Sequence, residues 1–495
     1  MNQNHNRKAT VAIQSLLRPE LTQVCANKDY EEFADTLDKI ESLFKTLDLE
    51  TEIIKIISEE NAHLNIKELS RLSQQTITAF KTEALRSLLG NLSFRVFSTQ
   101  IACSDLLAKF CGALSIEGIK GVSKSVLERN SKMLKSESLI LLHQHITGLV
   151  CDSKGASDCG LACAIEIKDQ FVDSTCIEAN VHYPVDWLLL KDLCSTLLFA
   201  TALIRKKKVL CRMPQEPESF HSNLNQLCIK MTNTRRKKNA KKTRKGIFRE
   251  LKKFTRVVAA HASRHSKKLE GSWEGTDWSV AQKDLVRNRI KHMLGLLDSI
   301  VYQANERIIG ERLIASKDKV LSIYDLELEV LVRGKAGKEV EYGNKFFLSE
   351  SVHGYVFDFN LIKGNLDDRD LLKESLQKME EGKLPQASSI CGDRGFNGGT
   401  ATEVLKRHKM KDNTCPRSVE VLQEKLKDKG FTSQQKRRAS TEARIAILKN
   451  KFNLGALRSK GFINRQQSCS YAVLTHNLWK LAKILQGQEK ELQVA

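Results

Sequence analysis

The chain is 495 residues long and 41% hydrophobic, which excludes a disordered composition and predicts more than one folded domain. Its 80 Lys and Arg residues outnumber its 59 Asp and Glu residues, giving a formal net charge of +21. An excess of this size favours a polyanionic partner, which could be DNA, RNA or an anionic membrane.

The cysteines and the most apolar stretch of the chain indicate the cellular compartment. The 13 cysteines follow no repeating spacing and are odd in number, which is typical of reduced thiols in a cytosol. The most lipid-like stretch, residues 187–204, carries Lys191 and Asp192, and its apolar runs are shorter than the ~20 residues that a span requires. The sequence therefore predicts a cytoplasmic protein with no membrane partner.

Residues 1–165 are expected to form an all-helical N-terminal domain, because apolar residues recur there at spacings of three and four. Residues 105–129 have the pattern of two short helices around a turn, with Ser123 as the N-cap of the second. That helix would carry the basic residues Lys124, Arg129 and Lys132. A DNA-recognition helix and an ordinary helical hairpin fit this pattern equally well.

A stretch rich in Val, Ile and Thr over residues 167–179 predicts a strand that carries Asp173. A helix over residues 185–204 is expected to follow. Glu178 and His182 lie close to Asp173, but the strand period of two places them on the opposite face, which favours a structural role.

Residues 205–314 are expected to form a basic, mostly helical insertion domain that ends in an amphipathic helix over 278–314. Between Arg235 and Arg256, 12 of 22 residues are Lys or Arg, which is too dense for an ordinary solvated face. The cluster predicts contact with a nucleic-acid backbone, although a flexible basic linker is the simpler alternative. The expected phosphate-contacting residues are Arg235, Arg236, Lys237, Lys238, Lys241, Lys242, Arg244 and Lys245.

Trp273 and Trp278 follow the basic cluster in Gly-Ser-Trp-Glu-Gly-Thr-Asp-Trp. Such tryptophans could stack on an unpaired base, but anchoring a loop on a core is their commoner use.

The last third of the chain alternates strands and helices. Strands are expected at 319–324, 329–333, 345–350, 354–362, 387–392 and 413–416, and helices at 368–381, 400–409, around Glu442, and at 471–485. The strand over 387–392 leads directly into Asp393, in Cys-Gly-Asp-Arg-Gly-Phe-Asn. Gly392 and Gly395 are expected to allow a sharp turn there.

This order of elements resembles a ribonuclease H-like α/β fold with an insertion after its first strand. Residues 166–204 and 315–485 would form that domain. In open sheets of this kind, functional residues gather beyond the carboxyl ends of the strands, where Asp173 and Asp393 are expected. Asp325, Asp358 and Asp368 are rival acids, and Asp325 is the most serious because it also ends a predicted strand.

Asp173, Asp393 and Glu442 are therefore the candidate metal-binding and catalytic residues. Carboxylates suit Mg²⁺, and two such ions stabilise the attacking and leaving oxygens of a phosphodiester displacement. On one helix, Arg438 and Glu442 lie four residues apart and Lys449 lies seven residues further on, so the three share a face. The cations could contact phosphates beside the acid, although a plain salt bridge between Arg438 and Glu442 explains that pair equally simply.

Four blocks of residues together resemble the DDE transposases of bacterial insertion sequences that carry a Tyr-x2-Arg-x3-Glu-x6-Lys motif. Arg438, Glu442 and Lys449 keep that spacing, with Gln435 in place of the Tyr. The other blocks are Asp173-Ser-Thr-Cys-Ile-Glu-Ala-Asn-Val-His-Tyr-Pro, Gly364-Asn-Leu-Asp-Asp-Arg-Asp with Asp393-Arg-Gly-Phe-Asn, and the closing His476-Asn-Leu-Trp.

The resemblance implies cleavage of DNA at the ends of a mobile element and joining of a 3′-hydroxyl to target DNA. It implies two Mg²⁺ ions, which Mn²⁺ could replace, and a homodimer on paired ends. The N-terminal domain would bind the ends of double-stranded DNA, and residues 205–268 would follow its backbone. The expected location is the bacterial cytoplasm, on the nucleoid when DNA is bound.

Three alternatives remain open. The chain could be a DNA-binding protein without catalysis, or a structure-specific nuclease that cuts but does not join. It could also be an RNA-binding protein that uses the Arg235–Arg256 cluster, although only Phe248 and Phe254 interrupt that cluster with aromatic rings.

Overall fold

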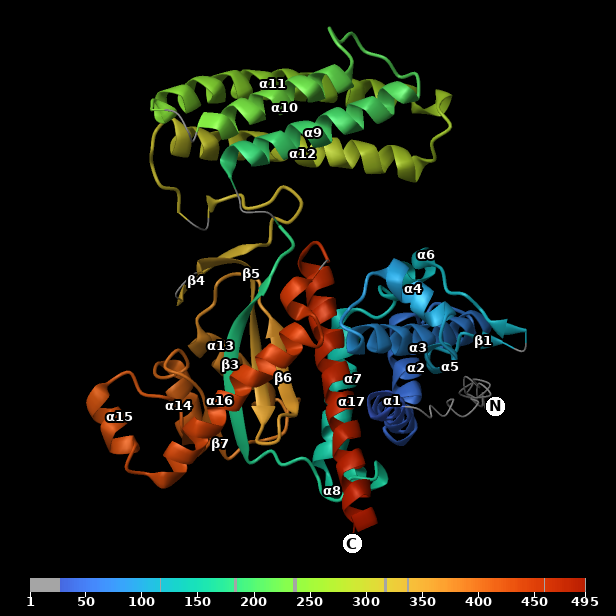
Figure 1. Ribbon diagram of the computed structural model, residues 1–495, viewed down its shortest axis with the longest axis vertical. Helices are drawn as coiled ribbons and strands as arrows, with labels where there is room; N and C mark the ends of the chain where they lie inside the picture. The colour runs from blue at the N-terminus through green and yellow to red at the C-terminus, as the bar shows by residue number, and fades with distance from the viewer. Residues whose placement is uncertain are drawn as a thin grey trace, which may run out of the picture. The chain divides into compact units, whose positions relative to one another are not determined.

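A computed structural model describes residues 27–115, 117–181, 185–234, 238–315, 318–335, 338–457 and 459–494. The chain forms two compact units, residues 1–179 with 343–495 (unit 1) and residues 180–342 (unit 2). Helices account for 64% of the structure, around one mixed sheet (Figure 1). These boundaries differ from the expected ones, because the N-terminal helices belong to the same unit as the sheet.

The strand order of the main sheet places the strand that carries Asp173 beside the strand that leads to Asp393. Its strands are β3 (Asp169–Glu178), β4 (Glu329–Lys335), β5 (Lys338–Ser351), β6 (Val356–Leu361), β7 (Ser389–Cys391) and β8 (Lys411–Asp412). The order is β6-β5-β3-β7-β8, with β4 also paired to β5. Strand β5 runs antiparallel to β3 and β6, whereas β7 runs parallel to both β3 and β8.

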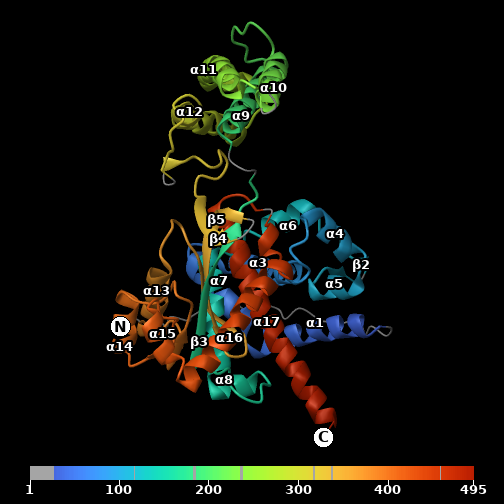
Figure 2. The same cartoon turned by 60° about the vertical axis from the view of Figure 1, so that its left-hand side comes forward.

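Helices cover both faces of this sheet. On one face, α13 (Asp368–Glu380) and α14 (Thr400–Arg407) enclose a core that includes Val172 and Ile390. On the other face, α16 (Lys429–Asn450) lies along β3 in both views, and α17 (Phe462–Val494) packs on β6 (Figures 1 and 2). Side chains alternate between faces along a strand, so Phe171 and Asp173 point to the side of α16.

The N-terminal helices share a core with β5, β6 and α17. They are α1 (Lys28–Thr46), α2 (Leu49–Glu60), α3 (Ile66–Leu88), α4 (Phe94–Ala102), α5 (Asp105–Phe110), α6 (Lys124–Asn130), α7 (Ser136–Cys151) and α8 (Ser153–Asp158). The Ser123 hydroxyl accepts the Val126 amide at 3.4 Å, which confirms the expected N-cap of α6. Between α5 and α6 the chain forms a small pair of strands, β1 (Leu114–Ser115) and β2 (Gly118–Ile119), where a simple turn was expected.

Unit 2 is built around four long helices: α9 (Asp186–Lys206), α10 (Pro217–Asn233), α11 (Ala240–Ser272) and α12 (Val280–Ile308). Helix α9 packs against the other three, which places it in this bundle rather than in the sheet domain where it was expected. Within the described ranges, α9 is the one helix long and apolar enough to cross a membrane by length and composition. Its Leu190, Leu193 and Leu197 are instead buried in the bundle core.

Trp273 and Trp278 lie in the connection between α11 and α12. Both are partly buried against the bundle core, and the Lys283 ammonium lies 4.8 Å from the centre of the Trp273 ring. This packing is what the loop-anchoring interpretation predicts for the two tryptophans.

Candidate active site

Asp173 lies on β3, and Asp393 lies two residues beyond the end of the neighbouring parallel strand β7. The pairing of β3 with β7 runs in register to Phe171 opposite Cys391, and each aspartate follows two residues later. Side chains two residues apart on a strand share a face, so Asp173 extends to the side of the sheet that α16 covers. Cys391, the last residue of β7, also faces α16, since its Sγ lies 3.4 Å from the Gln435 amide nitrogen. Strand pairing thus brings together two segments that are about 220 residues apart in the sequence.

The glycines around Asp393 provide space rather than an unusual backbone. Neither Gly392 nor Gly395 has a positive φ, which corrects the expected reason for their presence. A Cβ on Gly392 would lie 2.8 Å from the Val172 side chain. A Cβ on Gly395 would lie 2.5 Å from Asp368 Oδ2 and 3.0 Å from Asp393 Oδ1, and the Gly395 amide donates to Asp393 Oδ1 at 2.7 Å.

Asp173 is the most perturbed acid of the site. Burial raises the pKa of its carboxyl to about 6, and the nearby carboxylates of Asp393 and Glu442 act in the same direction. The Ser174 amide, which donates to Asp173 Oδ1 at 2.7 Å, and the Arg438 guanidinium lower that pKa again. The predicted residues Asp393, Arg438 and Glu442 therefore all lie close enough to Asp173 for their charges to act on its carboxyl.

Helix α16 supplies Arg438, Glu442 and Lys449. Arg438 Nη1 lies 3.7 Å from Glu442 Oε1, so the simple ion pair is present. Its side chain is 22% exposed and its Nε has no partner within the described residues, whereas the Glu442 side chain is 67% exposed. Lys449 is the penultimate residue of the helix, and a Cβ on Gly455 would lie 3.4 Å from the Lys449 Cβ. Arg438 thus pairs with an outward-facing glutamate and also acts on the half-buried Asp173.

Gln435, at the position where the resemblance expects a tyrosine, ties α16 to the sheet. Its side-chain amide donates to the carbonyl of Asn413 at 2.7 Å and to the carbonyl of Gly392 at 3.2 Å. Gly392 immediately precedes Asp393, so Gln435 holds the backbone that carries the second aspartate.

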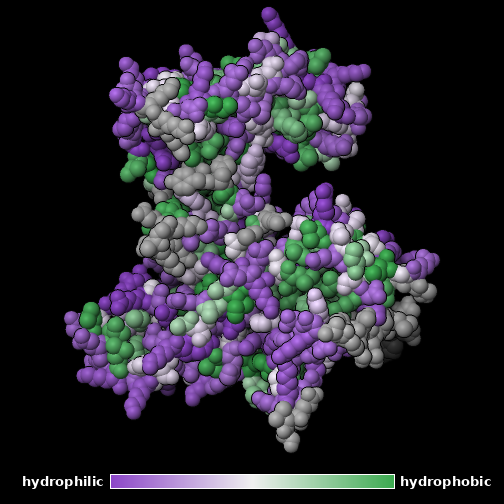
Figure 3. All heavy atoms as spheres, in the orientation of Figure 1, coloured by the Kyte–Doolittle hydropathy of each residue, from purple (hydrophilic) through white to green (hydrophobic). Residues whose placement is uncertain are grey.

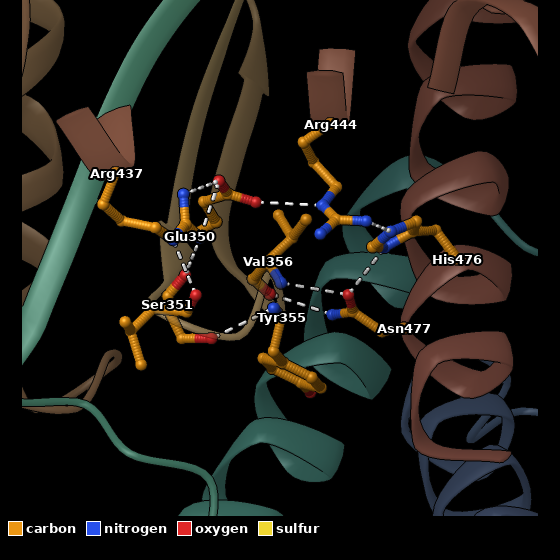
Figure 4. Close-up of polar contacts among 9 residues, drawn as sticks. Glu350, Ser351, Tyr355, Val356, Arg437, Arg444, His476 and Asn477 are labelled. Carbon is orange, nitrogen blue, oxygen red and sulfur yellow. Dashed lines mark hydrogen bonds and ion pairs between the residues drawn. The ribbon is translucent and has the colours of Figure 1, made fainter. Parts of the chain in front are cut away.

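A second set of contacts fixes the opposite side of α16. Glu350, whose side chain is fully buried on β5, accepts from Arg437 Nη1 at 3.1 Å and from Arg444 Nε at 3.0 Å (Figure 4). Arg444 also reaches the ring of His476 on α17 at 3.2 Å, and burial next to Arg444 lowers the pKa of that imidazole to about 3. A buried carboxylate with two guanidinium partners therefore sets the rotation of the helix that bears Glu442.

Asn477 extends this network from α17 to the sheet. Its side chain accepts from the Val356 amide at 3.1 Å and donates to the Val356 carbonyl at 2.9 Å (Figure 4). His476 and Asn477 belong to the closing block of the sequence resemblance. Their contacts are those of residues that fix the position of a helix.

Among the rival acids, Asp368 is the one that lies close to the predicted pair. It accepts from the Ser174 hydroxyl at 2.8 Å, and its other oxygen lies against Gly395. Asp358 pairs with Lys378 at 2.7 Å on the face covered by α13, and Asp325 lies in unit 2. Asp325, the strongest rival in the sequence, is thus outside the unit that holds the other acids.

The donor chemistry of the site suits Mg²⁺, but the three acids do not form a closed set. The Asp173 carboxyl has a raised pKa, to which the charge of Asp393 contributes, and a hard cation bound beside them would relieve that repulsion. Within the described part of the chain, no group of three or more His, Cys, Asp or Glu side chains is placed to hold a metal ion. The aspartate pair therefore fits a cation that keeps most of its waters, while Glu442 faces Arg438.

In unit 2, basic side chains form a line along α11. Lys242, Arg249, Lys253, Arg256 and Lys267 are exposed and repeat at spacings of seven, four, three and eleven residues, which places them on one stripe of the helix. The stripe extends over roughly 37 Å at 1.5 Å per residue. Hydrophilic side chains dominate the visible surface of this bundle (Figure 3).

The residues predicted to contact phosphate differ in their exposure. Lys238, Lys241 and Lys242 are exposed, whereas Arg244 and Lys245 are half-buried, and both Lys241 and Lys245 pair with Glu311. Outside the described residues lie Arg235, Arg236 and Lys237, and also His182.

Four cations of the stripe lie in the segment predicted to follow the DNA backbone but were not among the individual residues expected to contact phosphate. They are Arg249, Lys253, Arg256 and Lys267. Their spacing along a helix is the signal that could have identified them.

No protein family model matches the chain, and neither the curated proteins nor the solved structures searched contain a match to it.

Proposed function

We propose that the chain is a metal-dependent DNA strand transferase of the DDE transposase type, with a ribonuclease H-like catalytic domain in unit 1. The observation that carries the proposal is the parallel register of β3, which carries Asp173, with β7, which ends two residues before Asp393, beside a helix that carries Arg438 and Glu442. The strand order β6-β5-β3-β7-β8, with the second strand antiparallel to the first, supports the same fold.

The residues of the site have separate tasks in this proposal. Asp173 and Asp393 would hold Mg²⁺, and Glu442 would complete the set by leaving its ion pair with Arg438. Metal bound there would supply Lewis-acid stabilisation for the attacking and leaving oxygens. Arg438, which pairs with Glu442 and acts on Asp173, would contact the phosphate beside the scissile bond. Lys449 would act as a second phosphate contact, and Gln435 would keep Asp393 in position.

Unit 2 would hold the DNA backbone. The exposed stripe on α11 matches in length about one turn of a double helix, and backbone binding depends on the number of cations rather than on their individual geometry. We propose a homodimer on paired DNA ends and a location in the bacterial cytoplasm, both of which rest on the sequence resemblance alone.

The test uses the full chain and linear DNA that contains the segments flanking its reading frame. We expect Mg²⁺-dependent strand cleavage followed by covalent joining to a second DNA, and we expect Asp393→Asn to abolish both reactions while binding to the ends persists. Asp358→Asn, which changes an acid on the opposite face of the sheet, is the matched control.

Full cleavage by Asp393→Asn in Mg²⁺ would remove this residue from the mechanism and the proposal with it. Cleavage without joined products would instead favour a nuclease on the same fold. Binding without any cleavage by the unaltered chain would favour a DNA-binding protein.

A further inference from the structure

A cavity of about 410 Å³ lies in unit 1, and none of the three acids lines it. Its walls come from α3, α4 and α6 on one side and from the start of α17 with the preceding loop on the other. This volume falls within the usual range for small-molecule sites. No sequence pattern indicates a pocket here, because its walls lie more than 300 residues apart in the chain.

The rim of the cavity is cationic. Arg95, Lys124, Lys132 and Lys460 line it, and all four residues are exposed at its edge. The acids in the lining are Glu83 and Glu128, and Glu128 lies 3.8 Å from Lys124. The positive charge therefore exceeds the negative charge, which favours an anionic group on the ligand.

The interior contains polar atoms that no described residue satisfies. Glu83 and Tyr471 line the cavity and are only 2% and 4% exposed. The Glu83 Oε1 atom and the Tyr471 hydroxyl each lack a hydrogen-bond partner among the residues that the structure describes. Buried polar atoms without partners are rare in folded proteins, because each loses its hydration without replacement.

The two atoms line the same cavity, and one can accept a hydrogen bond while the other can donate one. Glu83 Oε2 is engaged by Arg86 at 2.7 Å, which leaves Oε1 as an acceptor. Burial raises the pKa of the Tyr471 phenol well above its usual value and the Glu83 carboxylate raises it further, so the hydroxyl keeps its proton and can donate. A ligand with a donor next to an acceptor on one edge would satisfy both atoms.

We propose that this cavity binds a nucleotide, with the phosphate at the rim formed by Arg95, Lys124, Lys132 and Lys460 and the base edge at Glu83 and Tyr471. Nucleobases present adjacent donors and acceptors on one edge. The nucleotide could be free in solution or an unstacked residue of a DNA strand, and the same contacts serve both. The proposal is independent of strand transfer, since none of these residues belongs to the acidic site.

The experiment measures binding of each 2′-deoxynucleoside 5′-monophosphate to the full chain by titration calorimetry. We expect saturable binding that is tighter than that of the matching nucleoside or of inorganic phosphate. Tyr471→Phe, which removes only the hydroxyl, should weaken binding about tenfold, and a double change of Arg95→Gln with Lys132→Gln should remove the advantage over the nucleoside.

Two controls separate a binding role from a structural one. Tyr355→Phe removes a buried hydroxyl that has a partner, Thr147 at 3.1 Å, and should lower the melting temperature without changing nucleotide binding. Tyr471→Phe should leave the melting temperature of the free protein unchanged or higher, because its hydroxyl has no protein partner among the described residues. Lys67→Gln, an exposed change elsewhere on α3, should change neither property.

A short single-stranded oligonucleotide added as competitor identifies the source of the ligand. Displacement of the monophosphate by the oligonucleotide indicates a DNA nucleotide, and no displacement indicates a free one. Absence of saturable binding by all four monophosphates, equal binding by Tyr471→Phe, or equal affinity for inorganic phosphate would overturn the proposal.

Discussion

The surroundings of α16 in unit 1 and the stripe on α11 in unit 2 use charge in opposite ways. Residues 180–342 contain 33 Lys and Arg against 18 Asp and Glu, a net charge of +15, whereas the rest of the chain contains 47 against 41, a net charge of +6. The charges next to α16 are paired and largely buried, as Glu350 with Arg437 and Arg444 demonstrates. Those of the α11 stripe are exposed to solvent.

The difference shows what each region can do. A buried ion pair fixes one geometry, because an unpaired partner would be left without solvation. Exposed cations define no single geometry, but together they raise the local concentration of a polyanion. Unit 1 is therefore suited to position a few atoms, and unit 2 to hold an extended phosphate backbone.

The largest expected effect comes from neutralising the buried acid. Glu350→Gln leaves two guanidinium groups without their charge partner, so we expect the free energy of unfolding of unit 1 to fall by about 3–5 kcal/mol. Chemical denaturation measures the change. Glu489→Gln, which breaks the pair of an exposed acid with Lys39, should cost less than about 1 kcal/mol, and similar losses for both variants would contradict the assigned role of Glu350.

The next effect tests the space around Arg444. Gly354 has φ +83°, and a Cβ there would lie 1.7 Å from Arg444 Nη2, so we expect Gly354→Ala to destabilise the fold by about 2–3 kcal/mol. Gly364 has nearly the same φ of +85° but open space around it, and its Ala variant should cost only about 1 kcal/mol of backbone strain. Equal melting temperatures for the two variants would show that Arg444 moves aside freely.

The ionisation of Asp173 should have a smaller, pH-dependent effect on the free energy of unfolding. The folded pKa of Asp173, about 6, lies above its ordinary value of 3.8, so the folded state holds this proton more tightly than the unfolded state. The resulting stability is present below pH 3.8 and is lost as the pH rises through 6; the full loss is about 3 kcal/mol, of which about 2 kcal/mol falls between pH 4 and 7. We expect Asp173→Asn to lack this loss in denaturation curves between pH 4 and 7.

Divalent ions sharpen the same experiment. Mg²⁺ should stabilise the unaltered protein above pH 6, where Asp173 is ionised, and much less at about pH 4.5. A Mg²⁺ effect that persists undiminished in Asp173→Asn would place the ion elsewhere.

The smallest effect on stability should come from the stripe. Replacing Lys242, Arg249, Lys253 and Arg256 by Gln should change the free energy of unfolding by no more than about 0.5 kcal/mol, because all four residues are exposed. The salt dependence of duplex DNA binding should nevertheless fall by about 0.9 in logarithmic slope for each phosphate that the protein no longer neutralises. An unchanged slope would exclude the stripe as the binding surface.

The control for the stripe uses cations of the other unit. Lys45, Lys55, Lys67 and Lys135 are exposed lysines of unit 1, and changing all four to Gln removes the same number of charges. We expect this variant to retain nearly the full salt dependence of the unaltered protein. An equal fall in slope for both variants would show that net charge, rather than the stripe, governs binding.

Local patterns in the sequence predicted most of the elements. The strand at β3, the helices α9, α12 and α13, and the cap of α6 all follow from residue periodicity or from a capping residue. The expected strand over 319–324 is absent from the described structure, and α15 (Val419–Lys425) was not expected. Short segments of this kind depend on their neighbours more than on their own composition.

The candidate site was harder to predict than the elements. The type and order of Asp173, Asp393 and Glu442 are visible in the sequence, but the register that aligns the first two is a property of strand pairing. The importance of Glu350 could not be predicted, because its partners Arg437 and Arg444 lie more than 80 residues away. Asp368 likewise becomes significant only when α13 folds against the sheet.

The way in which unit 2 joins the sheet has a consequence for how such a chain could arise and be re-engineered. Glu178 pairs directly with Gly343, so the chain leaves one strand and returns on its neighbour at the same level, after 164 intervening residues. Gly343 permits this approach, since a Cβ there would lie 2.1 Å from the Ile177 carbonyl. Residues 179–342 are thus an insertion between the paired ends of β3 and β5. A tight two-residue turn could replace this insertion without removing the pairing of β3 with β5.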